Sequence, residues 1–398
     1  MSRFNKQFFI GNRERLMQAL PDSLIVMTAN ASLQQSADLA FPYRQDSNFW
    51  YLTGIAEPDL LLVMDTQNGS ISLLLPEQND YQIEWDGAIE TSGYEESSGI
   101  TLFETQAVLK ELLKKARKAG LKVCSLQPTT ERVEPYGFYS NPARKLLYEL
   151  LSKNGVRDPQ DIRVEIARLR QIKQTPELEA IQSAIDATGV VLADIKAGLK
   201  SLHTEKELER ALTAGFYSAG TDGHAYEPIV ASGKNASIIH YNKNNSKLAR
   251  NQLVLLDVGA QVEGYAADIS RTWVVGKPTK RQQEVWDAAL ELQEKAFSML
   301  KPGVMLKEYQ AEMELHAAKT LKKLGKPAKQ FPHGFSHFLG LDVHDAGDYS
   351  APLEAGSVIT VEPGLYFPDE SIGVRVEDNV LITKNGYLNL SAGIPKLL

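Results

Sequence analysis

The segment 255–272 constrains the fold more than any other part of this sequence. Apolar β-formers run into Asp257, a polar tip with two flanking glycines follows, and β-formers resume through Asp268. This pattern predicts a β-hairpin. We place its turn between Val262 and Glu263. Asp257 and Asp268 would then face each other, with Cβ atoms roughly 4.5–5.5 Å apart. Two facing carboxylates are unfavourable unless a cation or proton lies between them, so the hairpin indicates either a metal site or a coincidence of two surface aspartates.

Length and composition limit the possible functions. A chain of 398 residues is too long for one ordinary core, so we expect two domains, 1–160 and 161–398. The net charge of −7, with no long basic run, argues against nucleic acid or an anionic membrane as a partner. No apolar stretch approaches the ~20 residues that span a bilayer, and we see no signal peptide. The single cysteine, Cys124, excludes an internal disulfide and a cysteine-based zinc site, and we expect a cytoplasmic protein.

The two regions differ in their secondary-structure pattern. Residues 1–160 mix helical and strand-like segments, which predicts an α/β domain. The strand-like runs in it are 23–28, 49–53, 59–64, 71–75 and 122–126. In residues 161–398 a pair of helices is followed by a β-rich segment, and this order occurs twice. The second region therefore predicts an α+β domain with an internal duplication.

Two further carboxylates lie in strand contexts of the second region. Glu362 ends a strand-like run and is followed by a Pro-Gly turn. Glu377 lies within the strand-like run 373–382, where alternation places it on the same face as Arg375. A carboxylate within an apolar strand is unfavourable unless it is paired or metal-bound. Arg375 is the candidate ion-pair partner in the interpretation that needs no metal.

Three histidines, His333, His337 and His344, lie within twelve residues of one another. A lone histidine is more often a satisfied core or surface residue. Three in an aromatic segment with glycines indicate metal ligation, proton transfer or both.

Four carboxylates with at least one imidazole suit two divalent ions better than one, because mononuclear zinc sites usually use histidine or cysteine. Two ions roughly 3.5–4 Å apart need bridging carboxylates, which Asp268 and Glu377 can supply. Hard oxygen ligands favour Mn²⁺, Mg²⁺ or Co²⁺ and do not exclude Zn²⁺. These residues predict a two-metal hydrolase, and ligand chemistry alone does not decide between peptide and phosphate ester.

These motifs resemble those of the pita-bread metallopeptidases, which include aminopeptidase P, prolidase and methionine aminopeptidase. The motifs are residues 256–259, 267–272, 333–337, 361–364 and 374–377. Residues 341–345 look most like the aminopeptidase P and prolidase branch. Residues 41–54 are similar to the N-terminal, creatinase-like domain of aminopeptidase P. The resemblance therefore implies a creatinase-like α/β domain followed by a pita-bread catalytic domain with a pseudo-two-fold duplication.

The resemblance also implies residue roles. The implied metal ligands are Asp257, Asp268, His337, Glu362 and Glu377. They would hold two divalent ions, with manganese in first place and cobalt, zinc or magnesium as alternatives. The implied catalytic residues are Glu362, as a proton shuttle, with His240 and His344, which would hold the substrate carbonyl and the tetrahedral intermediate. His333 and Arg375 match positions in the substrate pocket.

By this resemblance the substrate is a small peptide with proline at position two, cut at the Xaa–Pro bond, and the enzyme is a dimer or tetramer. The Xaa–Pro amide has no N–H, so a protease that binds extended backbones by hydrogen bonds loses a donor there. An Xaa-Pro dipeptidase (prolidase) shares every ligand and remains the near alternative. A non-catalytic peptide-binding module and a metal-free creatinase-like hydrolase are further alternatives, which five intact ligand positions disfavour.

Overall fold

The computed structural model describes residues 2–134, 137–328 and 331–398, and the chain divides into two compact units, Met1–Leu169 and Arg170–Leu398. The division follows Leu169 rather than residue 160, the boundary expected from the sequence. The reason is β10 (Gln160–Asp161), which pairs in parallel with β7 (Lys122–Ser125) and so belongs to the sheet of the first unit.

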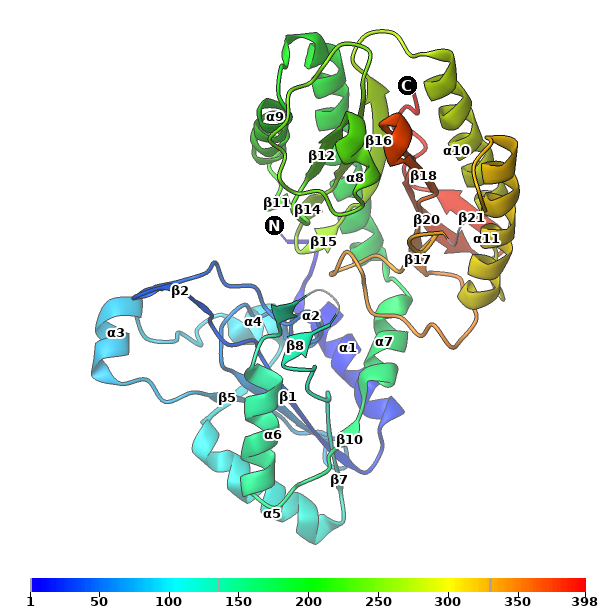
Figure 1. Cartoon of the computed structure of the whole chain (residues 1–398). Coiled ribbons are helices and arrows are strands. Elements are labelled where there is room, and N and C mark those ends of the chain that lie inside the picture. The colour runs from blue at the N-terminus through cyan, green and yellow to red at the C-terminus, as the bar shows by residue number, and fades with distance from the viewer. Residues whose placement is uncertain (1, 135–136, 329–330) are drawn as a thin grey trace. The chain divides into compact units, whose positions relative to one another are not determined.

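The first unit is built on a six-stranded mixed sheet in the order β10-β7-β1-β4-β5-β6 (Figure 1). Central β1 (Ser23–Thr28) runs parallel to β7 and antiparallel to β4 (Leu61–Asp65). β4 forms a hairpin with β5 (Ile71–Leu75), and β6 (Leu102–Thr105) runs parallel to β5. The apolar faces of α5 (Leu109–Ala119) and α6 (Ala143–Lys153) pack in one buried cluster with β1, β4 and β5. The remaining elements are α1 (Lys6–Ala19), α2 (Ser47–Thr53), α3 (Asp80–Asp86), α4 (Tyr94–Ser98), β2 (Gln34–Ser36), β3 (Leu39–Ala40), β8 (Arg132–Val133) and β9 (Phe138–Tyr139).

The aromatic run 49–53 is helical, so the strand expected there is wrong. It forms most of α2, whose N-cap is Asp46, with its side chain accepting hydrogen bonds from the backbone N–H groups of Asn48 and Phe49 at 2.9 and 3.1 Å. Gly54 ends the helix with φ of +68°. Caps at both ends outweigh the strand preference of the aromatic residues.

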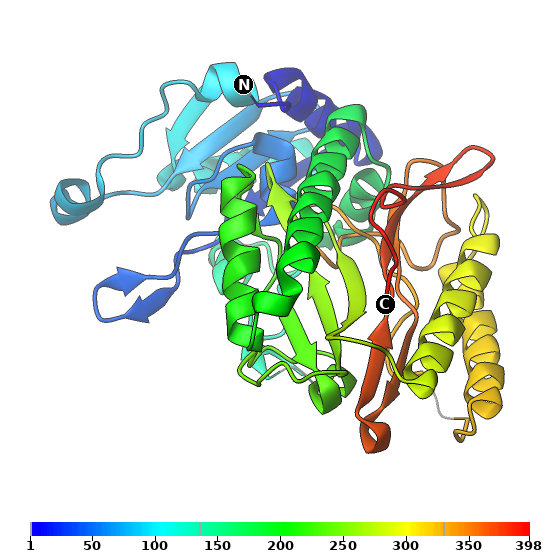
Figure 2. The same ribbon diagram turned by 90° about the horizontal axis from the view of Figure 1, so that it is seen from above.

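The second unit contains the expected duplication of helix pair and strands. A connecting helix, α7 (Arg163–Gln171), leads into it. The first pair is α8 (Thr175–Gly198) and α9 (Glu205–Ser218), and the second is α10 (Lys280–Ser298) and α11 (Leu306–Lys323). Seen from above, the strands of this unit lie between the two helix pairs (Figure 2). No helix among the described residues is long and apolar enough to cross a bilayer.

Each helix pair precedes its own set of strands. The first set comprises β11 (Gly223–His224), β12 (Ile229–Ser232), β13 (Leu253–Val258), β14 (Ala260–Val262), β15 (Tyr265–Ala266) and β16 (Ile269–Val274). The second comprises β17 (Val358–Val361), β18 (Gly364–Phe367), β19 (Ile372–Arg375), β20 (Asp378–Thr383) and β21 (Gly386–Asn389). In both sets a long hairpin is broken in each arm: β13/β14 against β15/β16, and β17/β18 against β19/β20. The continuous strand expected over 373–382 is therefore two strands.

The register of the first hairpin differs from the expected one. Its two-residue turn is Glu263-Gly264, with φ of +48° and +82°, and Val262 pairs with Tyr265. Positive φ at both positions is the geometry of the turn that matches strand twist, and the glycine adopts it readily. Asp257 consequently pairs with Ser270 rather than with Asp268.

The breaks in this hairpin bring two backbone segments into close contact. Gly259 lies between β13 and β14, and a Cβ atom added there would be 1.7 Å from the carbonyl oxygen of Ala267. On the opposite arm, Asn379 holds the backbone of Asp268 through both amide atoms, at 3.1 Å from its N–H and 2.6 Å from its carbonyl oxygen. The position of Asp268 thus depends on glycine at 259.

We expect Gly259→Ala to lower the free energy of unfolding by about 1–3 kcal/mol or more, because the added methyl group must push the two arms apart. Gly198→Ala is the matched control, since nothing lies within 4 Å of a Cβ at that helical position. The control should be neutral or slightly stabilising. Urea unfolding followed by circular dichroism measures both, and equal midpoints would contradict the close approach.

Candidate metal centre

The four expected carboxylate ligands lie at the breaks of the two hairpins. Asp257 is the penultimate residue of β13, and Glu362 directly follows β17. Asp268 lies between β15 and β16, and Glu377 lies between β19 and β20. Each half of the duplication therefore supplies one carboxylate near the end of its first strand and one at the break of the returning arm.

The fifth expected ligand, His337, lies in the irregular segment before β17. Backbone contacts fix it, because its N–H donates to Thr360 Oγ1 at 3.2 Å and its carbonyl accepts from Thr360 N–H at 2.9 Å. Its Nδ1 lies 3.0 Å from the Phe338 carbonyl oxygen, to which it donates. Its Nε2 lies 3.4 Å from both Asp268 Oδ2 and Glu362 Oε1. This tautomer leaves the Nε2 lone pair for a metal.

The ligand atoms form a compact, buried group. One atom each from Asp268, His337 and Glu377 lies within 4.8 Å of the other two, and all three residues are buried. Glu377 Oε2 accepts from Ser270 Oγ at 2.8 Å, whereas its Oε1 is buried without a hydrogen-bond partner among the described residues. An unpaired buried carboxylate oxygen aimed into a carboxylate–imidazole cluster fits a bound cation.

The pKa values of the cluster also indicate that it requires a cation. Burial, with the charge of Asp257, raises the pKa of Asp268, and burial with neighbouring carboxylates raises the pKa of Glu377 well above its usual value. Burial and the charge of Asp268 raise the pKa of Glu362 to about 7. Although burial opposes it, hydrogen bonding to Asp268 and the nearby carboxylates raise the pKa of His337 to about 9. These carboxylates ionise together only when positive charge is supplied.

Tyr226 is a site residue that the sequence did not reveal. Its hydroxyl lies 2.6 Å from Asp257 Oδ1 and 2.6 Å from Asp268 Oδ1. These aspartates occupy diagonal rather than opposite positions of the hairpin, and the phenol lies between their carboxylates. The lone tyrosine precedes a strand by a few residues and carries no motif that distinguishes it from other tyrosines.

Arg375 does not pair with Glu377, the partner expected for it in the interpretation that needs no metal. Its Nη2 contacts Asp257 Oδ2 at 2.5 Å, so its ion pair is with Asp257 rather than with Glu377. Its Nε donates to Ser270 Oγ and its Nη1 to the Tyr366 hydroxyl, both at 2.8 Å. Ser270 therefore joins the guanidinium to the Glu377 carboxylate.

The remaining expected residues surround the ligands. His333 Nδ1 lies 3.5 Å from Glu362 Oε2, and its Nε2 lies 2.8 Å from the Tyr366 hydroxyl. The His344 ring stacks on His337 at 4.0 Å. Burial lowers the pKa of both His333 and His344 to about 4, so both are neutral near pH 7. His240 is exposed and close enough to these two histidines for its charge to lower their pKa values.

Buried polar groups hold the two irregular segments that present the histidines. Asp345, directly after His344, is fully enclosed and pairs with Arg170 and with Lys173 Nζ at 2.9 Å. The loop that carries His240 is tied to the buried Glu205 carboxylate, which accepts five hydrogen bonds. Its donors are the N–H and hydroxyl of Ser232, Asn235 Nδ2, the Tyr241 hydroxyl and the N–H of Ser246, at 2.7–3.0 Å.

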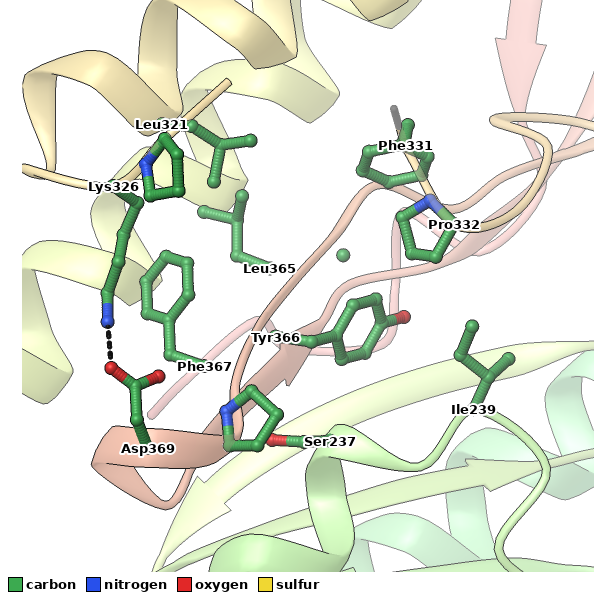
Figure 3. A pocket seen from close by; sticks show the side chains of 13 residues that line it. Ser237, Ile239, Leu321, Lys326, Phe331, Pro332, Leu365, Tyr366, Phe367 and Asp369 are labelled. Atoms are coloured by element: carbon green, nitrogen blue, oxygen red, sulfur yellow. Dashed lines mark hydrogen bonds and ion pairs between the residues drawn. The ribbon is translucent and has the colours of Figure 1, made fainter. Parts of the chain in front are cut away.

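A cavity of about 390 Å³ is lined by Tyr366, whose hydroxyl contacts His333 and Arg375 (Figure 3). Tyr366 forms its central wall, with Phe331 and Pro332 on one side and Ile239 at one end. The other lining residues are Ser237, Leu321, Lys326, Pro327, Gly364, Leu365, Phe367, Pro368 and Asp369.

Comparison with known proteins assigns the family. Residues 179–384 match metallopeptidase family M24, and residues 9–123 match the aminopeptidase P N-terminal domain. The first match spans more than half of the chain. The chain belongs to metallopeptidase family M24. It is a hydrolase with the pita-bread fold, in the aminopeptidase P branch of the family.

Individual relatives resemble the chain over nearly its whole length. Xaa-Pro aminopeptidase 3 of Homo sapiens is 32% identical over 431 residues, which cover 99% of this chain and 83% of the human protein. Xaa-Pro aminopeptidase of Escherichia coli is 32% identical over 446 residues, which cover 100% of this chain and 97% of the E. coli protein. The structure of E. coli aminopeptidase P with the inhibitor Pro-Leu superposes with a TM-score of 0.82 at 30% identity. The match covers 100% of this chain and 96% of the E. coli chain.

We expect Tyr226→Phe to weaken the binding of Mn²⁺ by roughly 10–100-fold, because groups that hydrogen-bond to metal-binding carboxylates orient them. Tyr217→Phe, at an exposed position 64% accessible to solvent, is the control. Isothermal titration calorimetry of the metal-free protein with Mn²⁺ gives both affinities. Unchanged affinity in Tyr226→Phe would show that the phenol contributes nothing to the arrangement of the aspartates.

The raised pKa values predict how the stability of the metal-free protein varies with pH. Glu362 binds its proton more tightly when folded, so it contributes stability that is lost as pH rises from 4.5 to about 7. His337 likewise contributes stability that is present below 6.5 and lost as pH rises to about 9. Both groups therefore lower the free energy of unfolding as the pH rises.

His333 and His344, whose pKa values are lowered to about 4, oppose this change below pH 6.5. We therefore expect the melting temperature in EDTA to fall between pH 6.5 and 8.5, and the increase caused by saturating Mn²⁺ to be larger at pH 8.5. Differential scanning fluorimetry measures both. A Glu362→Gln, His337→Gln double variant is the control and should show a smaller fall. An increase in stability across this range in the metal-free wild type would contradict the assignment.

Proposed function

We propose that this protein is an Xaa-Pro aminopeptidase that removes the first residue from peptides whose second residue is proline. The observation that carries the proposal is the cluster of buried Asp268, His337 and Glu377 with half-buried Asp257 and Glu362 in an M24 chain. Its relatives at 32% identity are named for this activity.

The residues that would hold two divalent cations are Asp257, Asp268, His337, Glu362 and Glu377. Four carboxylates and one imidazole favour manganese, with cobalt, zinc or magnesium as alternatives. When bound, such a pair lowers the pKa of a shared water to near neutrality and polarises the substrate carbonyl.

Glu362 is the proposed proton carrier. Its carboxylate lies between His337 Nε2 at 3.4 Å and His333 Nδ1 at 3.5 Å. In this role it accepts a proton from the attacking water and delivers it to the proline nitrogen as the Xaa–Pro bond breaks. The prolyl leaving group must therefore lie beside Glu362.

The neutral histidines would orient the substrate. His344 stacks on His337, and with a pKa of about 4 it is a neutral hydrogen-bond donor near pH 7. Together with the exposed His240 it would donate to the substrate carbonyl and to the tetrahedral intermediate. His333 and Arg375 would line the side of the leaving proline, where the Tyr366 hydroxyl joins them at 2.8 Å.

Substrates longer than a dipeptide are favoured by the cavity. A dipeptidase needs a positive charge for the carboxylate of proline. The one cation among the described lining residues, Lys326, already pairs with Asp369 and Glu370 at 2.6 Å each. Arg375, on the side of the leaving proline, already pairs with Asp257 at 2.5 Å. We further propose a cytoplasmic homo-oligomer, because the lone Cys124 is buried and the resemblance to aminopeptidase P implies a dimer or tetramer.

Metal-loaded protein should release alanine from Ala-Pro-Leu at least ten times faster than from Ala-Pro, and should leave Ala-Ala-Leu uncut. Glu362→Gln should lower kcat by roughly 10²–10⁴-fold, the usual contribution of a general acid or base. Glu354→Gln, at an exposed position before β17, is the control and should retain full activity. Chromatography of the released amino acid gives the rates.

Cleavage confined to Ala-Pro would identify a dipeptidase instead. If neither proline peptide is cut while two metals are bound, the peptide-binding module becomes the better explanation.

A further inference from the structure

We propose that the 390 Å³ cavity beyond Tyr366 binds an apolar side chain of the third residue of the substrate, the residue after proline. The proposal rests on the proposed function, because it requires the prolyl group to leave beside Glu362.

A continuous chain of contacts leads from Glu362 to the cavity. Glu362 Oε2 lies 3.5 Å from His333 Nδ1, and His333 Nε2 lies 2.8 Å from the Tyr366 hydroxyl. Tyr366, whose hydroxyl makes this contact, also lines the cavity. The cavity therefore lies on the leaving-group side of the centre, one aromatic side chain away from the histidine that contacts Glu362.

The size of the cavity exceeds the needs of one prolyl ring. Clefts of roughly 300–1,000 Å³ enclose ligands of drug size, which have several times the atoms of such a ring. An extended chain advances ~3.3–3.6 Å per residue, so the residue after a prolyl group beside Glu362 is within reach of the His333–Tyr366 pair that borders the cavity. The far end then receives the third side chain.

The walls at that far end are apolar and rigid. Leu365 and Phe367 are 2% and 3% exposed, and β18, which carries them, is paired along its length with β19. Leu321 of α11 closes the end from the other side, with Phe367 and Lys326 beside it (Figure 3). A preformed apolar pocket favours a leucine-like or phenylalanine-like side chain over glycine.

The charges at this end are already neutralised. Lys326 pairs with Asp369 and Glu370, and Arg281 contacts Glu370 through Nε at 2.7 Å. The Lys326 ammonium also lies over the Phe367 ring, 4.9 Å from its centroid. Two cations thus balance two carboxylates, and a charged third residue would lose hydration without gaining a free partner.

The first experiment compares kcat/KM of the metal-loaded enzyme for Ala-Pro-Gly, Ala-Pro-Leu and Ala-Pro-Asp. We expect Ala-Pro-Leu to exceed both of the others by about tenfold, mainly through a lower KM. The second readout needs no turnover: Pro-Leu, the product of the leucine peptide, should bind the metal-free protein about tenfold more tightly than Pro-Gly in calorimetry.

Leu321→Trp fills the far end without touching a proposed ligand or catalytic residue. We expect it to lower kcat/KM for Ala-Pro-Leu about tenfold and to leave Ala-Pro-Gly within twofold of wild type. Leu315→Trp, on the same helix at a position 59% exposed, is the matched control and should change neither value. Leu321→Ala, which enlarges the pocket, should shift the preference from Ala-Pro-Leu towards Ala-Pro-Trp.

The outcomes separate this proposal from the proposed function. If neither Ala-Pro-Gly nor Ala-Pro-Leu is cut, the aminopeptidase assignment fails. If Ala-Pro-Gly and Ala-Pro-Leu are cut equally well, and Leu321→Trp lowers both or neither, the enzyme stands and the cavity is not the pocket for the third residue. Retained cleavage of Ala-Pro-Gly by Leu321→Trp also shows that this variant is folded.

Discussion

Repulsion among buried carboxylates is the constraint on which the catalytic unit depends. Asp268 and Glu377 are almost fully enclosed, and burial raises the pKa of both. The charge of Asp257 further raises the pKa of Asp268, and the charge of Asp268 further raises that of Glu377. Without added positive charge, such a cluster retains protons or weakens the fold. The protein supplies only part of that charge itself, through Arg375 on Asp257. A pair of divalent cations would supply the remaining positive charge. Metal binding and the folding of this unit are therefore linked.

The duplication explains how so many acids come together. Each half has one carboxylate at or next to the end of its first strand and a second one at the break of the returning arm, so corresponding breaks in the two halves bring four carboxylates together. Backbone contacts join the halves there: the Glu377 N–H donates to the Ser270 carbonyl at 3.1 Å, and the Thr272 hydroxyl bonds both backbone groups of Arg375. The buried pair of Arg271 with Asp378 lies directly behind. The four proposed carboxylate ligands are therefore held by strand pairing, whereas His337 is held in an irregular segment by its backbone contacts with Thr360.

The sequence predicted the parts of this structure that depend on local chemistry. The end of the strand at Glu362, for example, depends on the Pro-Gly pair directly after it, and β17 ends within one residue of the expected position, at Val361. The hairpin register was wrong by one position because the turn depends on φ at Glu263 and Gly264, which composition indicates only weakly. Residues 49–53 were assigned to a strand because aromatic residues suggest one, whereas the flanking Asp46 and Gly54 decide for a helix. Tyr226 and Glu205 could not be predicted, because their partners are distant in the chain and become neighbours only in the fold.

One departure from the duplication has a directional consequence. A centre made only from two equivalent carboxylate pairs would present the same face to a peptide from either half, and nothing in it would distinguish the amino end of a substrate from its carboxyl end. His337 has no counterpart among the ligands of the first half, since it comes from the irregular segment before β17. Its imidazole makes the two ends of the centre chemically different, with Glu362 and His333 on its own side. A single broken symmetry thus gives the site a polarity, which an enzyme that works from one end of a chain requires.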